Sequence, residues 1–280
     1  MEVITSIPAL RARIGAMRAN GQGIGLVPTL GGLHDGHAAL VEAARAAGDL
    51  PVATLFLNPA QFSESEDLER YPAERDADIA LLKAAGAALV FAPATEEIYP
   101  PGFSTRISIT AFEDVLCAQN RPGHFNGVSL VVCKLLCIAR AERAYFGEKD
   151  WQQCLVVKAL VRDLNIDTDI VTVPTARDSD GLALSTRNRY LTAAERRLAP
   201  QLYHEICEAA ARIAQGTPTE LACAEAQETL TLAGFSQVEY LECRNAETLR
   251  LAPSPGRGAR VFVAARLGAA RLIDNVPVPA

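Results

Sequence analysis

The sequence lacks an apolar run long enough to cross a membrane, since none of its apolar stretches approaches about 18 residues. Its first residues, MEVITSIPALRARIGAMRANG, also lack the apolar core of a secretory signal. Positive charge is in the minority, because 27 Lys and Arg stand against 33 Asp and Glu and the formal net charge is -6. This balance gives no support for sequence-independent binding to nucleic acid. We therefore expect a cytoplasmic protein that binds neither membranes nor nucleic acid.

Cysteine pairs of the C-x-x-C type are also missing, and the seven cysteines are an odd number scattered along the chain. This pattern is typical of reduced residues rather than of a disulfide framework. Cys133 and Cys137 lie four residues apart, which permits a metal pair on a helix. No His or further Cys is spaced to complete a four-ligand zinc set, so we predict no protein-bound metal.

Apolar residues make up 49% of the 280 residues and follow two patterns that alternate along the chain. Short runs rich in Val, Ile and Leu predict strands, and longer stretches with apolar residues three and four positions apart predict helices. This alternation predicts a Rossmann-like α/β fold, in which helices cover both faces of a mostly parallel sheet. The predicted strands are 24–29, 52–57, 88–91, 144–146 and 170–173, and the predicted helices are 37–47, 74–85, 128–140 and 150–164.

The pattern changes after Pro174, where the polar stretch TARDSDGLALSTRNRYL begins. Thr192 then predicts the cap of a long helix from Ala193 to about Gln215. Thr217 or Thr219 predicts the cap of a second helix that runs to about Ala233. Strands are predicted at 238–243, 260–265 and 270–273, and an exposed hairpin loop at 252–258. We therefore predict a Rossmann-like domain over residues 1–176 and a smaller C-terminal α+β domain over residues 177–280.

Three of the four histidines lie in glycine-containing turns. In VPTLGGLHDGH, a predicted strand runs into Gly31 and Gly32 before His34 and His37 open a helix. The carboxyl end of a parallel strand and the positive end of a helix are places where such folds bind phosphate. We predict that the two imidazoles and unengaged backbone amides bind an anionic phosphate group here. Alternatively, the glycines only allow a tight turn and the histidines act as helix caps.

Polar residues follow two other apolar segments. In NPAQF, the amides of Asn58 and Gln61 can bind hydroxyls and carboxylates, or the segment is an ordinary turn at the end of a strand. In RPGHF, Arg121 and His124 again combine a cation with a helix start. Alternatively, proline and glycine simply begin the helix.

Two later segments offer further positive charge. In YFGEKDWQQ, Lys149 supplies a mobile charge for phosphate, Asp150 can accept from ribose hydroxyls, and Gln153 follows one helical turn on. Alternatively, Asp150 is an ordinary helix cap and Lys149 is solvated. In GLALSTRNRYL, Arg187 can direct two donors onto phosphate oxygens from a loop that closes over substrate, or it is a solvated linker charge.

Together these five segments, with ARLIDN near the C-terminus, resemble the pantoate-beta-alanine ligase family over nearly the whole chain. HDGH also resembles the H-x-G-H signature of the wider nucleotidyltransferase superfamily. The resemblance implies an AMP-forming ligase that uses ATP to condense pantoate with beta-alanine through a pantoyl adenylate. It further implies Mg²⁺ with ATP, a homodimer, nucleotide and pantoate binding by the first domain, and a second domain that acts as a lid near the dimer contact.

The resemblance also assigns roles to single residues. It implies that His34, His37, Lys149 and Arg187 are catalytic, with His37 the candidate proton donor. Gln61 and Gln153 are implied to bind pantoate, and Gln61 to contact beta-alanine as well. ATP binding is implied for Leu30, Gly31, Gly32, Leu33, His34, Asp35, Gly36, His37, Gly147, Glu148, Lys149, Asp150, Ala176, Leu184, Ser185, Thr186 and Arg187.

Two other functions remain open from the sequence. An adenylyltransferase that attaches AMP to a phosphate-bearing substrate shares HDGH but not necessarily the other segments. A nucleotide-binding module without catalytic activity shares the phosphate-binding residues and has no turnover. Leu30 and Leu184 stand where the family commonly has methionine, and Thr186 where it commonly has serine. These departures keep size or chemistry, so we expect them to bear on affinity.

Overall fold

The computed structural model describes residues 1–63, 68–252 and 258–279, and the chain divides into two compact units. Unit 1 comprises Met1–Glu113, Arg121–Glu148 and Gln152–Pro174. Unit 2 comprises Asp114–Asn120, Lys149–Trp151 and Thr175–Ala280. Two short segments from the first part of the chain thus join unit 2, a grouping that local sequence patterns do not reveal. The roles predicted for the two domains stay predictions.

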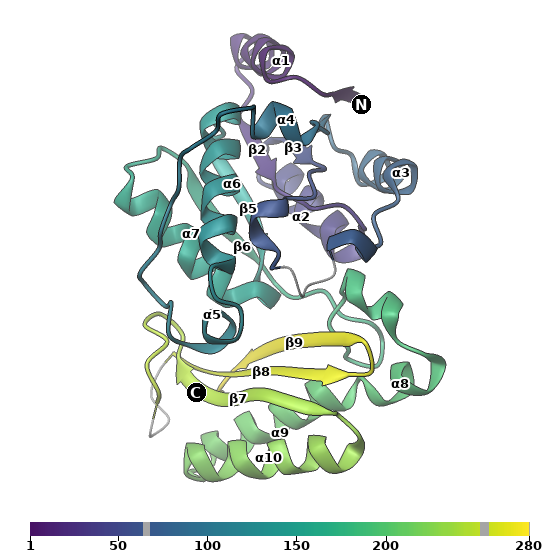
Figure 1. Cartoon of the computed structure of the whole chain (residues 1–280), viewed down its shortest axis with the longest axis vertical. Coiled ribbons are helices and arrows are strands. Elements are labelled where there is room, and N and C mark those ends of the chain that lie inside the picture. The colour runs from purple at the N-terminus through teal and green to yellow at the C-terminus, as the bar shows by residue number, and fades with distance from the viewer. Residues whose placement is uncertain (64–67, 253–257, 280) are drawn as a thin grey trace. The chain divides into compact units, whose positions relative to one another are not determined.

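A six-stranded parallel sheet forms the centre of unit 1, in the order β1-β4-β3-β2-β5-β6 (Figure 1). All four residues of β2 are buried, as expected for a strand with helices on both faces. The sequence pattern predicts five of the strands and does not predict β1. The strands are β1 (Glu2–Ile4), β2 (Ile24–Val27), β3 (Leu50–Thr54), β4 (Leu89–Phe91), β5 (Arg143–Gly147) and β6 (Asp169–Val173).

Helices cover both faces of this sheet, which confirms the predicted fold class. On one face, Leu40 and Val41 of α2 and Leu82 of α3 pack with Val27 and Val90 of the sheet. On the other face, α6 lies beside α7 (Figure 1) and α1 packs against α6. No helix within the described parts of the chain has both the length and the apolar character to span a membrane. The helical elements are α1 (Ile7–Ala19), α2 (Asp35–Ala46), α3 (Arg75–Ala85), α4 (Thr95–Ile98), α6 (His124–Ala139), α7 (Trp151–Asp163) and the 3-10 turns η1 (Pro59–Gln61), η2 (Leu68–Arg70) and η3 (Glu148–Asp150).

The order of the strands reverses at β2, which has β3 on one side and β5 on the other. In doubly wound sheets such a reversal opens a crevice beyond the carboxyl ends of the strands, where ligands bind. The loops that follow β2 and β5 leave the sheet at this point. They begin the segments GGLHDGH and GEKD.

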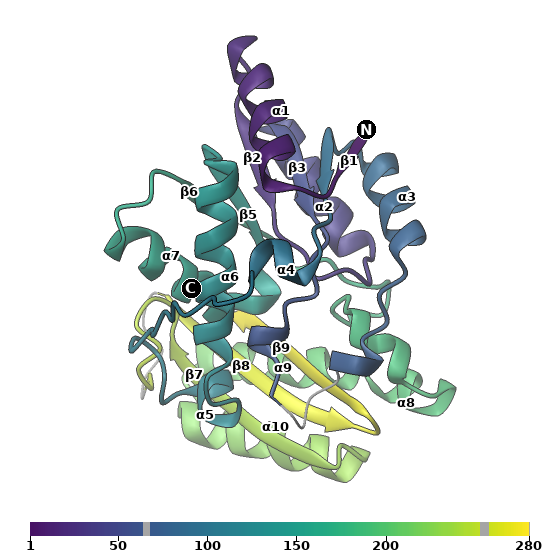
Figure 2. The ribbon, with the colours of Figure 1, turned by 45° about the horizontal axis from the view of Figure 1, so that its top comes forward.

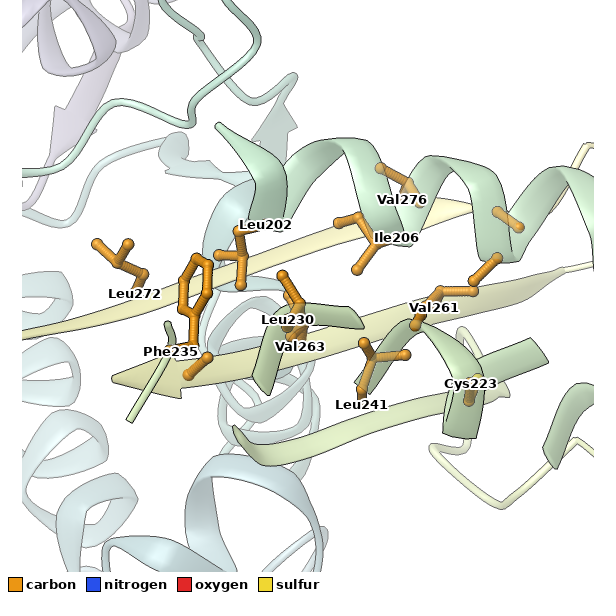
Figure 3. Packing of buried hydrophobic residues seen from close by; sticks show 14 of the residues in the cluster. Leu202, Ile206, Cys223, Leu230, Phe235, Leu241, Val261, Val263, Leu272 and Val276 are labelled. Atoms are coloured by element: carbon orange, nitrogen blue, oxygen red, sulfur yellow. The ribbon is translucent and has the colours of Figure 1, made fainter. Parts of the chain in front are cut away.

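Unit 2 is built on a three-stranded antiparallel sheet, with α9 and α10 packed side by side on one of its faces (Figure 2). Figure 3 shows Leu202 and Ile206 of α9 and Leu230 of α10 against Val261 and Val263 of β8. Every second residue of β8 joins this core, as the two-residue repeat of a strand requires. The elements are α5 (Leu116–Asn120), η4 (Thr186–Tyr190), α8 (Ala193–Leu198), α9 (Gln201–Ala214), α10 (Thr219–Ala233), β7 (Gln237–Asn245), β8 (Ala259–Leu267) and β9 (Ala270–Pro277).

The prediction of one long helix from Ala193 to about Gln215 is wrong. The structure has α8, which ends at Leu198, and α9, which begins at Gln201. Pro200 causes the break, because its ring removes a backbone donor from the hydrogen-bond ladder, although Ala199 and Pro200 both keep αR backbone angles. The next helix runs from Thr219 to Ala233 with Pro218 as its N-cap, so the prediction that Thr217 or Thr219 caps it is wrong. Most of the predicted hairpin loop, residues 253–257, lies outside the described residues.

Candidate active site

A tight glycine turn connects β2 to α2. Gly31 and Gly32 have φ angles of 97° and 65°, a region that favours glycine. A Cβ atom on Gly31 would lie 3.2 Å from both the Cβ of Ala73 and Oδ2 of Asp78. The turn therefore needs glycine for its backbone angles and for its close contact with neighbouring residues.

Asp78 of α3 holds this turn in place. Its carboxylate, only 3% exposed, accepts the amide of Gly32 at 2.8 Å and the amide of Leu33 at 2.7 Å. The prediction that backbone amides here are unengaged is wrong for these two residues, because a buried carboxylate requires donors. Asp78 is not among the residues that the sequence motifs predict for the site. The sequence does contain a sign of it: Asp78 is a charged residue on the same face of α3 as the buried residues Leu82 and Ala85.

The two histidines cap α2 and fix each other. Nδ1 of His34 accepts the amide of Gly36 at 3.1 Å, and Nδ1 of His37 accepts the amide of His34 at 3.3 Å. Since an amide can only donate, the proton of each neutral ring lies on Nε2. The ring centroids are 4.2 Å apart. The histidines are thus caps, as the structural alternative predicts, and the same cap orients two Nε2–H donors next to each other.

Asn58 orients the side chain of Gln61 at the end of β3. Oδ1 of Asn58 accepts the amide of Ala60 at 3.3 Å and the hydroxyl of Tyr99 at 2.8 Å. Burial raises the pKa of Tyr99 to about 12, so its hydroxyl stays a donor. Nδ2 of Asn58 must therefore donate, and it does so to Oε1 of Gln61 at 3.0 Å. Gln61 consequently keeps its NH₂ group as the end that offers donors to a ligand.

His124 fixes the same turn from α6. Its Nδ1–H donates to the carbonyl of Gln61 at 2.8 Å, and its Nε2 accepts from Nη1 of Arg121 at 2.9 Å. Gly127 allows α6 to approach, because a Cβ atom there would lie 2.0 Å from the carbonyl oxygen of Ala60. The RPGHF segment thus begins a helix, as its structural alternative predicts, and positions Gln61.

The second predicted pantoate ligand, Gln153, lies half-buried on α7. The neighbouring Gln152 is buried, and its Nε2 donates to the carbonyl of Phe112 at 3.1 Å. Phe112 adopts a φ of 65°, an uncommon angle for a non-glycine residue. Gln152 therefore supports the backbone of unit 1, and Gln153 is the glutamine on this turn that is not buried.

In unit 2, the backbone of Lys149 is held by β9. Nδ2 of Asn275 donates to the carbonyl of Lys149 at 3.0 Å, and Oδ1 of Asn275 accepts from Nε of Arg260. The guanidinium of Arg260 lies 3.9 Å from the ring centroid of Trp151, whose Nε1–H donates to the carbonyl of Ala246 at 2.7 Å. The segment that carries Lys149 is thus anchored at the lysine itself and at Trp151.

The segment before Arg187 forms an ordered hairpin in unit 2. Arg177 pairs with Ala183 in an antiparallel bridge, and the amide of Leu184 donates to the carbonyl of Ala176 at 2.9 Å. Oγ of Ser185 then accepts the amide of Arg187 at 3.3 Å. Residues Ala176 and Leu184 to Arg187, all predicted to bind ATP, therefore lie in one folded piece of chain.

Each unit thus brings some of the predicted residues together. Unit 1 gathers Gly31 to His37 in one capped turn and fixes Gln61. Unit 2 holds Lys149 and the hairpin before Arg187 on the same sheet. The prediction that His34 and His37 share one triphosphate with Lys149 and Arg187 stays a prediction.

Comparison with known proteins gives a consistent result. The model of the pantoate-beta-alanine ligase family matches residues 2–277. A pantothenate synthetase of Dinoroseobacter shibae is 51% identical over 278 residues, 99% of each chain. The crystal structure of pantothenate synthetase from Thermus thermophilus is 43% identical, with a TM-score of 0.95 and complete coverage of both chains.

A third relative is described with its ligands. The pantoate-beta-alanine ligase of Francisella tularensis, complexed with beta-gamma ATP and beta-alanine, is 32% identical. Its TM-score is 0.84, and the match covers 99% of this chain and 97% of that one. Since the family model and these relatives span almost the whole chain, this protein is an enzyme of the pantoate-beta-alanine ligase family.

Proposed function

We propose that the enzyme condenses pantoate with beta-alanine through a pantoyl adenylate. A carboxylate oxygen of pantoate attacks the α-phosphorus of ATP, and the bond to pyrophosphate breaks. The amine of beta-alanine then attacks the acyl carbon, loses a proton and displaces AMP. The observation that carries the proposal is the pair of imidazoles at the start of α2, oriented by backbone amides beyond the carboxyl end of β2.

The two imidazoles suit the first step of this reaction. Attack at the α-phosphorus brings two anions together and builds negative charge on phosphate oxygens, which oriented donors stabilise. Nε2–H of His34 and of His37 are such donors, and their orientation is set before the substrate binds. We propose that His37, the proton-donor candidate that the family resemblance implies, donates a hydrogen bond from Nε2 to the leaving pyrophosphate.

Gln61 suits the recognition of pantoate. Its Oε1 accepts from Asn58 and its backbone carbonyl accepts from His124, so the residue is held once at its side chain and once at its backbone. The remaining NH₂ group can donate to a hydroxyl or a carboxylate. We propose that Gln61 binds pantoate beside the entry of beta-alanine, and that Gln153 is the second pantoate ligand.

Lys149 and Arg187 supply the positive charge in this proposal. Only Glu148 separates Lys149 from Gly147 at the end of β5, so the chain keeps the Cα atom of Lys149 within about 7 Å of that strand end. Arg187 is held by the capped turn that starts at Ser185. We propose that both bind the phosphates of ATP, with Ala176, Leu184 and Thr186 completing the nucleotide site.

Mg²⁺ is expected to enter as part of the MgATP substrate, because phosphate oxygens are among its preferred ligands. Binding of the ion by the triphosphate would neutralise part of the charge that the imidazoles meet. ATP titration with and without Mg²⁺ tests this, and equal turnover in both series would contradict it.

Omission of single substrates tests the function. With MgATP, pantoate and beta-alanine present, we expect AMP and pantothenate in equal amounts, and no AMP accumulation when either organic substrate is left out. Pantoate alone should support exchange of labelled pyrophosphate into ATP. AMP formation that ignores beta-alanine would favour an adenylyltransferase. ATP binding without any turnover would favour a non-catalytic module.

Substitution of Lys149 tests the roles of the residues. Lys149→Ala should lower pantoate-dependent pyrophosphate exchange by about 100-fold or more, because a charge in the phosphate site is lost. Lys158→Ala on the exposed side of α7 is the matched control and should leave the exchange unchanged. An unchanged exchange rate in Lys149→Ala would remove this lysine from the mechanism.

The assembly and location follow from family membership as proposals. We propose a homodimer in the cytoplasm, with unit 2 acting as a lid. Light scattering of the purified full chain checks the assembly, and a mass equal to the 29.9 kDa monomer would contradict it.

A further inference from the structure

Two adjacent residues of β9 are polar and deeply buried. Asp274 and Asn275 are each 3% exposed. Asp274 lies between Leu272 and Val276, which belong to the core packed on α9 and α10. Because successive side chains of a strand point to opposite faces, Asn275 faces the other side of the sheet. One strand therefore presents a carboxylate to one face and an amide to the other.

Asp274 anchors the hairpin that precedes Arg187. Nη1 and Nη2 of Arg177 donate to its two carboxylate oxygens at 2.5 and 2.9 Å. Nη1 of Arg177 also donates to the carbonyl of Gly181 at 3.1 Å, and its guanidinium lies 3.8 Å from the ring centroid of Tyr203. Burial of two charges is costly unless the pair is fully engaged, as this one is. The pair therefore gives the hairpin one position relative to β9.

Asn275 anchors the other segment from the opposite face. Both ends of its amide are used, one by the carbonyl of Lys149 and the other by Nε of Arg260. Through Arg260 the contact extends to the indole of Trp151. No amino acid other than asparagine or glutamine offers both a donor and an acceptor in this arrangement of a planar amide.

We propose that Asp274 and Asn275 are positioning residues for the ATP step, which fix Arg187 and Lys149 on the two faces of one strand. The inference rests on the proposed function, which assigns these two cations to the phosphates of ATP. Neither Asp274 nor Asn275 contacts the nucleotide in this proposal. They act by limiting where the two cation-bearing segments lie, because oriented charges stabilise the transition state without reorganisation.

Kinetics of Asp274→Asn and Asn275→Ala test the inference. We expect pantoate-dependent pyrophosphate exchange to fall by about 10- to 100-fold, the cost of a small displacement of catalytic groups, together with a higher KM for ATP. The conversion of supplied pantoyl adenylate with beta-alanine to pantothenate should keep its rate. If the two residues served stability alone, the rates of both steps would fall by the same factor, because each rate would fall in proportion to the amount of folded enzyme.

A matched control exists on the same sheet. Glu239 of β7 has a side chain 5% exposed and pairs with Arg271 at 2.8 Å. Glu239→Gln removes a buried carboxylate from an ion pair, as Asp274→Asn does, without touching either segment. We expect Glu239→Gln to lose stability and to keep the exchange rate per folded molecule.

Fluorescence separates the two anchors, because Trp151 is the only tryptophan of the chain. Asn275→Ala should change the emission of Trp151, since Arg260 loses its acceptor beside the indole. Asp274→Asn should leave the emission as it is. If either variant does not fold, Asn275→Ser and Arg177→Lys repeat the test. Arg177→Lys keeps the positive charge and removes the bidentate hydrogen bonding to Asp274.

Folded variants at 274 and 275 that exchange pyrophosphate as fast as Glu239→Gln would overturn the inference. Lys149→Ala and Arg187→Ala then show which statement has failed. If these two lose exchange, the cations bind phosphate and only the positioning role is wrong. If they also keep it, the assignment of the two cations to the phosphates is wrong.

Discussion

The amino ends and the carboxyl ends of the strands in the parallel sheet of unit 1, called here its amino edge and its carboxyl edge, hold their carboxylates differently. At the amino edge, Asp49 accepts from Nε of Arg143 at 2.7 Å, and Glu142 accepts from Nε of Arg18 at 3.0 Å. At the carboxyl edge, the buried carboxylate of Asp78 accepts two backbone amides. The amino edge thus uses pairs of charged side chains, whereas the carboxyl edge uses the backbone to orient neutral imidazoles and amides.

The protonation of the amino edge follows from these pairs. Burial acts to raise the pKa of Asp49, but hydrogen bonds from Arg143 and Tyr145 outweigh it and hold the pKa below 3.8. In the same way, burial acts to raise the pKa of Glu142, and hydrogen bonds from Arg18 and the amide of Ile24 lower it. Such carboxylates keep one charge state near neutral pH, which suits stability. The imidazoles of the carboxyl edge each keep an Nε2–H that can donate a hydrogen bond to a substrate, which suits catalysis.

The largest expected effect comes from His37→Ala, which breaks the carboxyl edge. We expect pyrophosphate exchange to fall by about 10²- to 10³-fold, the usual cost of removing one oriented donor to developing negative charge. The free energy of unfolding should fall by only about 1 kcal/mol, because one helix-cap acceptor is lost. His204→Ala on the exposed face of α9 is the control. A variant that loses stability but retains its exchange rate would contradict the contrast between the edges.

Gly127→Ala tests the contact between α6 and η1. The new methyl group would lie 2.0 Å from the carbonyl oxygen of Ala60, so η1 must move and carry Gln61 with it. We expect a loss of about 1–3 kcal/mol in the free energy of unfolding and a higher KM for pantoate. Gly15→Ala in α1 meets nothing within 4 Å and should be neutral or slightly stabilising. Identical pantoate kinetics in both variants would show that Gln61 does not depend on this contact.

Asp78→Asn sharpens the comparison, because it changes the one buried carboxylate of the glycine turn. An amide can accept only one of the two backbone N–H groups well, so we expect a loss of about 1–2 kcal/mol and about a ten-fold slower exchange. Urea unfolding and the exchange assay measure the two effects. Asp76→Asn lies exposed on the same helix and should change neither. Full activity of Asp78→Asn would mean that the turn keeps its shape without this carboxylate.

The smallest effect is expected for Asp49→Asn, which breaks the amino edge. We expect a loss of about 1–2 kcal/mol at pH 7, moderated because Arg143 is partly exposed, and no change in kinetics. Because the folded pKa of Asp49 is lowered, its stabilisation is present above the unfolded pKa and is lost as the pH falls below about 4. The difference between parent and variant in urea unfolding should therefore shrink on acidification. A difference that grows on acidification would contradict a lowered pKa of Asp49 in the folded protein.

Much of the fold follows from local patterns. The apolar runs of β2 to β6 and the helical spacing of α2, α3, α6 and α7 are visible in the sequence, because each element repeats its own buried face. The same periodicity misleads at Pro200, because the alanine-rich pattern continues although one helix ends before the proline and another begins after it. It also gives no reason to place Lys149–Trp151 in unit 2.

Sequence alone offers helix capping as one of two roles for the histidines of the HDGH turn, since a cap depends on residues within one helical turn of each other. Only the tertiary structure decides that the carboxylate of Asp78 accepts a hydrogen bond from the amide of Gly32, 46 residues away. It likewise decides that the side chain of Asn275 donates to the carbonyl of Lys149, 126 residues away. Such contacts leave no period in the sequence, because each depends on a single pair of atoms that only the folded chain brings within hydrogen-bonding distance.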